Sequence, residues 1–443
     1  MKEMIKQGGL LNPILVVTTL LVSYIVNYFL NAFLAKNLGF TTYGDIAVAI
    51  RVLLVLAPII LLGTNVSLKK YMSFYYNTGQ TKMASFYLKW NLKVIRASFA
   101  ITFIIILLSS IALITLDALN IKELHEYHLA IYIIWVAPFM ATSLLLAGIL
   151  LSRRKYHASS IPRYLLQYII LFILFAAFVV LNVEIDNPSI VLIFLMTFLV
   201  IIAIQLALIA IYKIPFFKLL FKFNRKEKHK RTHHEVWRSV AFHCFLNSIM
   251  FILIGAIDLI IVEVFSPHEK DAGLYAAILI IVSSFRVISE GFRIFLVPHI
   301  NDFNMGDDRG KFQKLLTKCN LLYVGLLFLI AALILEFSSP LLSHFGPAYL
   351  IDTTPLIILT LGYSISGLFI FSGPMLAYLG HEKKLAFISM MGLICLLVFG
   401  SVATHFYGVT GIAYVTAAVF IFMNFTESII VRYCVGIRSS LIL

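Results

Sequence analysis

Apolar stretches of about 20 residues recur along the whole sequence and limit the possible folds more than any other feature. One such stretch, as an α-helix, crosses a hydrocarbon core roughly 30 Å thick. Of the 443 residues, 61% are hydrophobic and 13% are charged, whereas a soluble domain carries about 25% charged residues. No polar gap is long enough for a folded soluble domain. The sequence therefore predicts an all-α integral membrane protein.

We expect about twelve transmembrane helices in this chain. Their predicted ranges are 11–35, 44–66, 91–116, 128–150, 164–182, 189–212, 237–265, 274–298, 319–337, 355–379, 385–405 and 409–431. The first span follows Met1–Lys6 and is too long for the apolar core of a signal peptide. We expect it to stay in the protein as an uncleaved anchor.

A net charge of +14 could indicate a nucleic-acid-binding protein, so the distribution of the basic residues matters. They fall on alternate connectors, and the opposite connectors hold only Lys36, Lys122 and Lys270. Because Lys and Arg are concentrated in cytoplasmic loops, we predict that both termini are cytoplasmic and that nucleic acid is not a partner. The four cysteines show no metal-binding spacing and are expected to be small apolar packing residues.

The most basic connector lies at the middle of the chain and leaves six predicted spans on each side. We predict an N-terminal six-helix lobe at 1–212, a basic cytoplasmic connector at 213–236 and a C-terminal six-helix lobe at 237–443. A constant shift between the halves pairs Gly44 with Gly273, Lys82 with Lys311 and Asn91 with Asn320. An even number of spans gives both lobes one orientation, an arrangement that creates a central cavity in many transporters. The connectors 67–90 and 299–319 look amphipathic, which predicts that they lie along the inner surface.

Charged residues at membrane depth are the candidate functional groups, because each costs about 2.5–3.5 kcal/mol at a helix centre. They are Arg51 in the second span, Asp258 and Glu263 in the seventh, and Arg286, Glu290 and Arg293 in the eighth. The last three share one helical stripe through their i, i+4, i+7 spacing. The stripe is either a self-neutralising ladder or the lining of a cavity, and two cations against one anion favour the cavity.

The types of these residues suggest an anionic substrate. Arginine presents a planar fork that suits phosphate oxygens, so the stripe favours a phosphate or pyrophosphate head group. Asp258, Glu263 and Glu290 are candidates for coupling to H+ or Na+, with ion pairing an equal alternative. Glu427 is expected to pair with Arg432. Residues 306–312 lack the Ser/Thr of a phosphate-binding loop, and we predict no catalytic residues, metal or cofactor.

Four segments carry a resemblance to a known family: Leu34–Gly44, the stretch from Asp258 to Ala277, Phe345–Tyr349 and Tyr407–Ala413. Their order and spacing resemble the polysaccharide flippases (O-antigen and other lipid-linked oligosaccharides) of the multidrug/oligosaccharidyl-lipid/polysaccharide exporter superfamily. The resemblance implies two six-helix lobes in a V around a central cavity, and alternating access. It also implies basic cavity residues, which we assign to Arg51 and Arg286, and the charged stripe adds Arg293 to the predicted cavity lining. The first span lacks arginine and offers Asn27 and Asn31 instead.

We therefore expect a non-enzymatic flippase of polysaccharide biosynthesis in the bacterial inner membrane. It would move an undecaprenyl-(pyro)phosphate-linked oligosaccharide to the outer leaflet and could act beside a glycan polymerase or other assembly proteins. The alternatives are a small-molecule or cation-coupled antiporter of the same fold, and a membrane enzyme or scaffold of glycan assembly.

Overall fold

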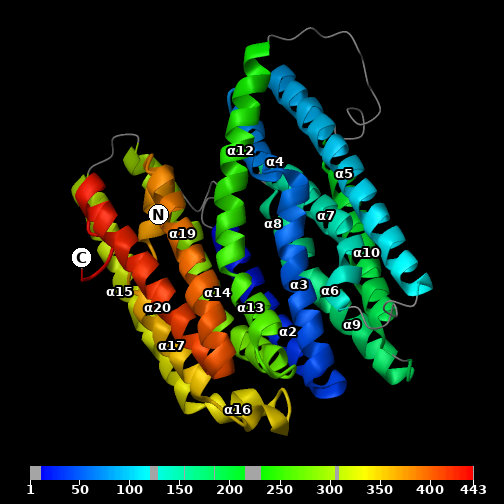
Figure 1. Cartoon of the computed structure of the whole chain (residues 1–443). Coiled ribbons are helices and arrows are strands. Elements are labelled where there is room, and N and C mark those ends of the chain that lie inside the picture. The colour runs from blue at the N-terminus through cyan, green and yellow to red at the C-terminus, as the bar shows by residue number, and fades with distance from the viewer. Residues whose placement is uncertain are drawn as a thin grey trace. The chain divides into compact units, whose positions relative to one another are not determined.

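A computed structural model describes residues 11–119, 128–153, 155–183, 185–214, 231–304 and 309–442. Within these ranges the chain forms helices and connecting turns, and no strand (Figure 1). The prediction of an all-α protein is confirmed.

The apolar helices agree with the predicted spans. Ten described helices are long and apolar enough to cross a membrane, and α17 (Thr354–Gly367) and α18 (Ser372–Tyr378) form a further candidate as a pair bent by 48°. One of the ten runs from Glu382 to Val435, about 80 Å of helix and more than twice the hydrocarbon thickness. Gly408 interrupts it with φ 54° and ψ −138°, so this stretch supplies two spans. The twelve predicted spans are all accounted for.

The chain divides into two compact units, which we describe separately. Unit 1 joins Met1–Val48 to Leu253–Leu443, and unit 2 is Ala49–Ile252. Residues 215–230, in the basic connector, lie outside the described residues. The predicted lobe boundaries at 212 and 237 therefore stay a prediction.

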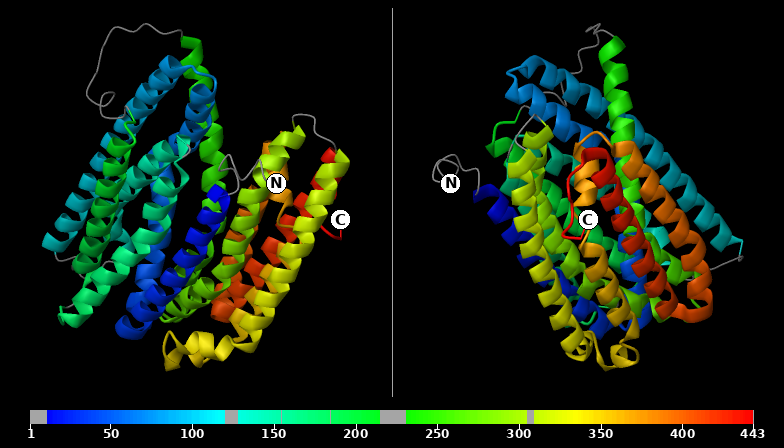
Figure 2. Two further views of the ribbon diagram at one scale, coloured as in Figure 1. Left: turned by 180° about the vertical axis from the view of Figure 1, so that it is seen from behind. Right: turned by 90° about the vertical axis from the view of Figure 1, so that its left-hand side faces the viewer.

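Unit 1 is a bundle of long helices in which α2 packs along α14, and α17 along α20. Its elements are α2 (Leu11–Leu38), the start of α3 (Phe40–Leu61), α13 (Ile257–Phe265), α14 (Asp271–Asn304), α15 (Arg309–Glu336), α16 (Ser338–Ser343), η4 (Pro347–Leu350), α17, α18, α19 (Glu382–Cys395), η5 (Leu396–Gly400) and α20 (Ser401–Val435). In both views of Figure 2 the C-terminus lies away from α16, toward the other end of the bundle.

Two glycines fix the close approach of α3 and α14 in unit 1. A Cβ atom on Gly44 would stand 2.8 Å from the backbone nitrogen of Gly273, and one on Gly273 would collide with the carbonyl of Phe40. Only glycine lets two backbones approach this closely. These are the two glycines that the shift between the halves pairs, so the repeat relates residues that lie against each other.

Unit 2 is built around α4, which packs on α5 and α7. Its elements are the rest of α3, α4 (Thr64–Asn77), α5 (Thr81–Ala118), α6 (Leu129–Tyr132), η2 (Ile133–Val136), α7 (Ala137–Ser152), α8 (Tyr156–Ser160), η3 (Ile161–Leu166), α9 (Gln167–Val180), α10 (Asn187–Ile211) and most of α12 (Arg231–Ile254). Asn91 on α5 donates to the carbonyl of Thr64 at 3.0 Å, and the Ser67 and Tyr87 hydroxyls are 2.7 Å apart. These buried hydrogen bonds join α4 to α5.

The two connectors expected to be amphipathic differ from each other. In the first, α4 is a separate helix of 14 residues. The second forms no separate helix in its described part, because α14 continues to Asn304 and α15 begins at Arg309. The described residues of 299–319 thus extend the two flanking helices, and their placement along the inner surface stays a prediction.

Candidate functional site

The charged stripe on α14 contains one ion pair and one further arginine. The Nη2 atom of Arg293 lies 2.7 Å from Oε1 of Glu290, with the two side chains 47% and 36% exposed. Arg286 is exposed, and in the part of the chain that the structure describes its side chain makes no hydrogen bond or ion pair. The ladder interpretation therefore holds for Glu290 and Arg293 and leaves Arg286 outside it.

The depth of Arg286 makes this exposure significant. The apolar span of α14 runs from Asp271 to Val297, which places Arg286 about 22 Å from one end and about 16 Å from the other. A guanidinium at this depth is costly against acyl chains and is stabilised by water or by an anion.

Asp258, which the sequence also predicts to lie in a span, has the opposite environment. It stands in the first turn of α13, after the turn at Gly255 and Ala256, and is 2% exposed. Its carboxylate accepts a hydrogen bond from the Leu259 backbone at 2.8 Å and one from the Tyr275 hydroxyl at 3.2 Å. The Tyr275 oxygen also lies 3.4 Å from Oγ1 of Thr416. Asp258 therefore joins α13 to α14 and, through Tyr275, to α20.

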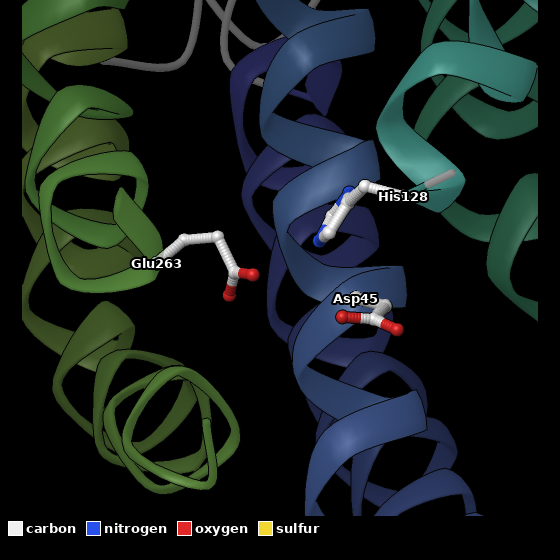
Figure 3. A group of neighbouring side chains, drawn as sticks. All are labelled: Asp45, His128 and Glu263. Atoms are coloured by element: carbon white, nitrogen blue, oxygen red, sulfur yellow. The ribbon is translucent and has the colours of Figure 1, made fainter. Parts of the chain in front are cut away.

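Glu263 lies one and a half turns after Asp258 on α13 and approaches a second carboxylate of unit 1. Figure 3 shows Glu263 on α13 and Asp45 on α3. Both are half-buried, and they offer carboxylate oxygens within 4.8 Å of each other. Two carboxylates this close can share a proton or a small cation. His128 in the same figure belongs to unit 2, where it caps α6 by accepting from the Ala130 backbone at 3.0 Å.

The two asparagines of α2 form part of a polar cluster in unit 1. Asn31 is 7% exposed and donates to the backbone oxygen and side-chain oxygen of Asn27 at 2.7 and 2.9 Å. Its own side-chain oxygen accepts from the Tyr43 hydroxyl at 3.1 Å. Tyr43 in turn packs edge-on against Tyr349, with ring centroids 6.5 Å apart. Both hydrogens of the Asn31 amide are thus used inside the unit, which leaves Asn27 as the more accessible of the two.

Arg51 is the one predicted cation of this set that belongs to unit 2. It is half-buried and lies near the middle of α3, the twelfth of its 22 residues. Sequence reasoning placed it correctly at the centre of a span.

Three polar residues of these clusters were missed by sequence reasoning. Tyr275 and Thr416 were not recognised as neighbours of Asp258, and Asp45 was not recognised as a neighbour of Glu263. Each contact joins helices that are far apart in sequence, so no periodicity within one helix indicates it. The acidic Asp45 close to the start of an apolar span was the one local signal available.

Comparisons with known proteins identify the fold. No family model and no curated protein matches this chain. The lipid II flippase MurJ in an inward closed conformation is 15% identical, covers 95% of this chain and 87% of its own, and has a TM-score of 0.68. A mutant of the Vibrio cholerae MATE transporter VcmN is 13% identical, covers 96% of each chain and has a TM-score of 0.62.

A MOP superfamily transporter from Pyrococcus furiosus, for which a binding pocket of reverse polarity suggests a different function, also matches. It is 11% identical, covers 96% of this chain and 95% of its own, and has a TM-score of 0.62. These likenesses extend over nearly the whole chain and show that it has the fold of MOP superfamily transporters.

Proposed function

We propose that this chain is a flippase that moves an undecaprenyl-(pyro)phosphate-linked oligosaccharide from the cytoplasmic to the outer leaflet by alternating access. The observation that carries the proposal is Arg286, an exposed arginine in the middle of an apolar span with no partner among the described residues. A lone cation at this depth does not stabilise the fold, because its insertion is costly and no described group compensates it. A phosphate group supplies the missing compensation, and the arginine fork matches its oxygens.

The fold and the membrane potential support this proposal. One solved structure with this fold is a lipid II flippase. A membrane potential that is negative inside favours outward movement of an anion by about 2.3 kcal/mol per charge per 100 mV. Coupling to H+ or Na+ at Asp258 or at the Asp45–Glu263 pair supplies further driving force in this scheme. Glu290 is less suited to coupling, because it is paired with Arg293.

The proposed setting follows from the substrate and from the distribution of charge. A lipid-linked oligosaccharide made in the bacterial cytoplasm needs a carrier in the inner membrane. The bias of basic residues toward alternate connectors supports cytoplasmic termini. A glycan polymerase or another assembly protein is the partner that would receive the product at the outer face.

The second candidate is a small-molecule antiporter coupled to a cation. It is favoured by the similarity to MATE transporters and by the buried Asp258, a carboxylate that could exchange a proton during transport. Such an antiporter would change drug accumulation in cells and would leave glycan display unaltered.

Purified protein in liposomes, given a fluorescent undecaprenyl-pyrophosphate oligosaccharide, tests the flippase. We expect Arg286→Ala to slow flipping about tenfold or more, since a hydrogen bond to a charged group contributes about 1.5–3 kcal/mol. Arg286→Lys should retain part of the rate, because it keeps the charge and loses the fork. Arg238→Ala removes an exposed arginine near the start of α12 and should flip normally. A folded Arg286→Ala protein with the wild-type rate would exclude Arg286 from the site.

A further inference from the structure

Glu427 on α20 is enclosed by the protein and faces the break between α17 and α18. It is 4% exposed. A Cβ atom on Gly373 would stand 2.9 Å from Oε2 and 4.0 Å from Oε1 of Glu427. The carboxyl group therefore occupies the space that the missing side chain of Gly373 leaves free.

This carboxyl group has no hydrogen bond and no ion pair among the described residues. The expected pair with Arg432 is not formed, because residues five apart lie on different sides of a helix while those three or four apart are neighbours. Titratable groups on the surrounding elements include Tyr363 on α17, Tyr378 on α18, Glu382, Lys383 and Lys384 on α19, Tyr323 on α15, Arg432, Tyr433 and Cys434 on α20, and Arg438 after α20. None of them bonds to Glu427, and the Lys384 ammonium contacts the Cys434 sulfur at 2.8 Å instead.

The backbone that faces Glu427 is irregular. The α17–α18 pair bends by 48°, and residues 368–371 between the two helices form tight turns such as Ile370 to Gly367 at 3.2 Å. Pro374 has no N–H, so the carbonyl of Ile370 lacks its helical donor. In transporters, interrupted helices of this kind commonly line ion and substrate sites.

The residues after α20 close this region. The Ser439 hydroxyl lies 2.8 Å from that of Ser372, next to Gly373, and 2.9 Å from that of Ser428, next to Glu427. Ser439 is 1% exposed, and Asn320 on α15 donates to its carbonyl at 3.0 Å. Glu427 is therefore a carboxyl group in an enclosed polar region, where an uncompensated negative charge is strongly unfavourable.

We propose that Glu427 is a proton-binding site at the break between α17 and α18, and that release of its proton is coupled to a change in the bend of this helix pair. A proton fits better than a metal ion, because a metal requires several ligands arranged around it, whereas the carboxyl group here fills the space beside a glycine that has no side chain to offer a ligand. The role of this coupling in a transport cycle rests on the proposed function, whereas proton binding by Glu427 does not depend on it.

Infrared difference spectra of the full-length protein, recorded between acidic and alkaline pH, test proton binding directly. The spectrum should contain the carbonyl band of a protonated carboxyl group that is lost in Glu427→Gln. The variant is nearly isosteric, so it is expected to fold. Glu382→Gln, which changes an exposed glutamate at the start of α19, should keep the band. Identical spectra for the wild type and Glu427→Gln would overturn the proposal.

Hydrogen exchange of residues 368–379 tests the coupling. Exchange rates are first corrected for the intrinsic pH dependence of exchange. In Glu427→Gln, the corrected rate of this segment should be the same at every pH and should equal that of the wild type at acidic pH. If the corrected wild-type rate does not change with pH, the coupling is excluded. The flipping assay then separates the two proposals. If Glu427→Gln loses the infrared band but the wild-type protein does not flip the lipid, the proton site stands and the flippase is refuted. If the wild-type protein flips the lipid and Glu427→Gln keeps the band, the flippase stands and the proton site is refuted.

Discussion

The charges of α14 and those of α13 and α20 lie in surroundings of opposite kind. On α14, Arg286 is exposed and the Glu290–Arg293 pair is 36% and 47% exposed. On α13 and α20, Asp258 and Glu427 are 2% and 4% exposed. The first set is accessible from outside the protein, and the second set is enclosed by helices of unit 1.

The two environments predict different effects of substitution on stability. An enclosed carboxylate with hydrogen bonds holds helices together, and its removal leaves buried partners unsatisfied. An exposed charge without a partner adds little to stability, and its cost at membrane depth requires another explanation. Substitutions on α14 should therefore change transport more than stability, and those at Asp258 should reduce stability as well.

The largest effect on stability is expected for Asp258→Ala. The change removes the acceptor of the Leu259 N–H and of the Tyr275 hydroxyl, which is fully buried. We expect a loss of about 3 kcal/mol of unfolding free energy, since each unsatisfied buried group costs about 1–3 kcal/mol and Thr416 can rescue only the tyrosine. Thermal unfolding of the purified protein in detergent measures this loss. An Asp258→Ala protein as stable as Arg286→Ala would contradict the contrast between the two regions.

A pair of glycine substitutions should give a smaller effect of the same kind. Gly373→Ala places a methyl group against the Glu427 carboxyl, whereas Gly325→Ala on α15 meets nothing within 4 Å. We expect Gly373→Ala to destabilise the protein by about 1–2 kcal/mol through overpacking. Gly325→Ala should be neutral or should stabilise by up to about 1 kcal/mol, because alanine favours a helix over glycine.

The same unfolding assay compares these two proteins. Equal stabilities would show that the carboxyl of Glu427 moves away from Gly373 without cost, and the enclosure of Glu427 would then be weaker than the structure indicates.

The sequence was sufficient to predict the spans and the charged stripe on α14, because both depend only on the composition and periodicity of a single helix. Hydropathy finds a span from local composition, and the positions of Arg286, Glu290 and Arg293 place them on one face without knowledge of the neighbouring helices. The break of the last long helix at Gly408 also fell where the sequence separated two spans.

The enclosed carboxylates could not be predicted in this way. Glu427 is buried because Gly373 leaves space for it, and the two residues lie on different helices. Asp258 likewise bonds to Tyr275 on another helix, and Tyr275 lies beside Thr416, which is 141 positions away in sequence. Such contacts depend on how helices pack in three dimensions, and a single sequence contains no local signal for them. Arg432 was the nearest basic residue in sequence to Glu427, and helix geometry excluded it as a partner.

The smallest effect is expected for Glu290→Gln, which breaks the ion pair on α14. An exposed pair contributes about 0–1 kcal/mol, and the amide can still accept a hydrogen bond from Arg293. We expect the unfolding free energy to change by about 0.5 kcal/mol or less. Flipping should respond more, because the stripe then carries one negative charge fewer beside Arg286 and Arg293. If the substrate is an anion, its apparent affinity should rise, and the gain should shrink as salt is added. A stability loss as large as that of Asp258→Ala, with flipping unchanged, would place the α14 charges among the groups that hold the fold together and would remove the distinction between the two regions.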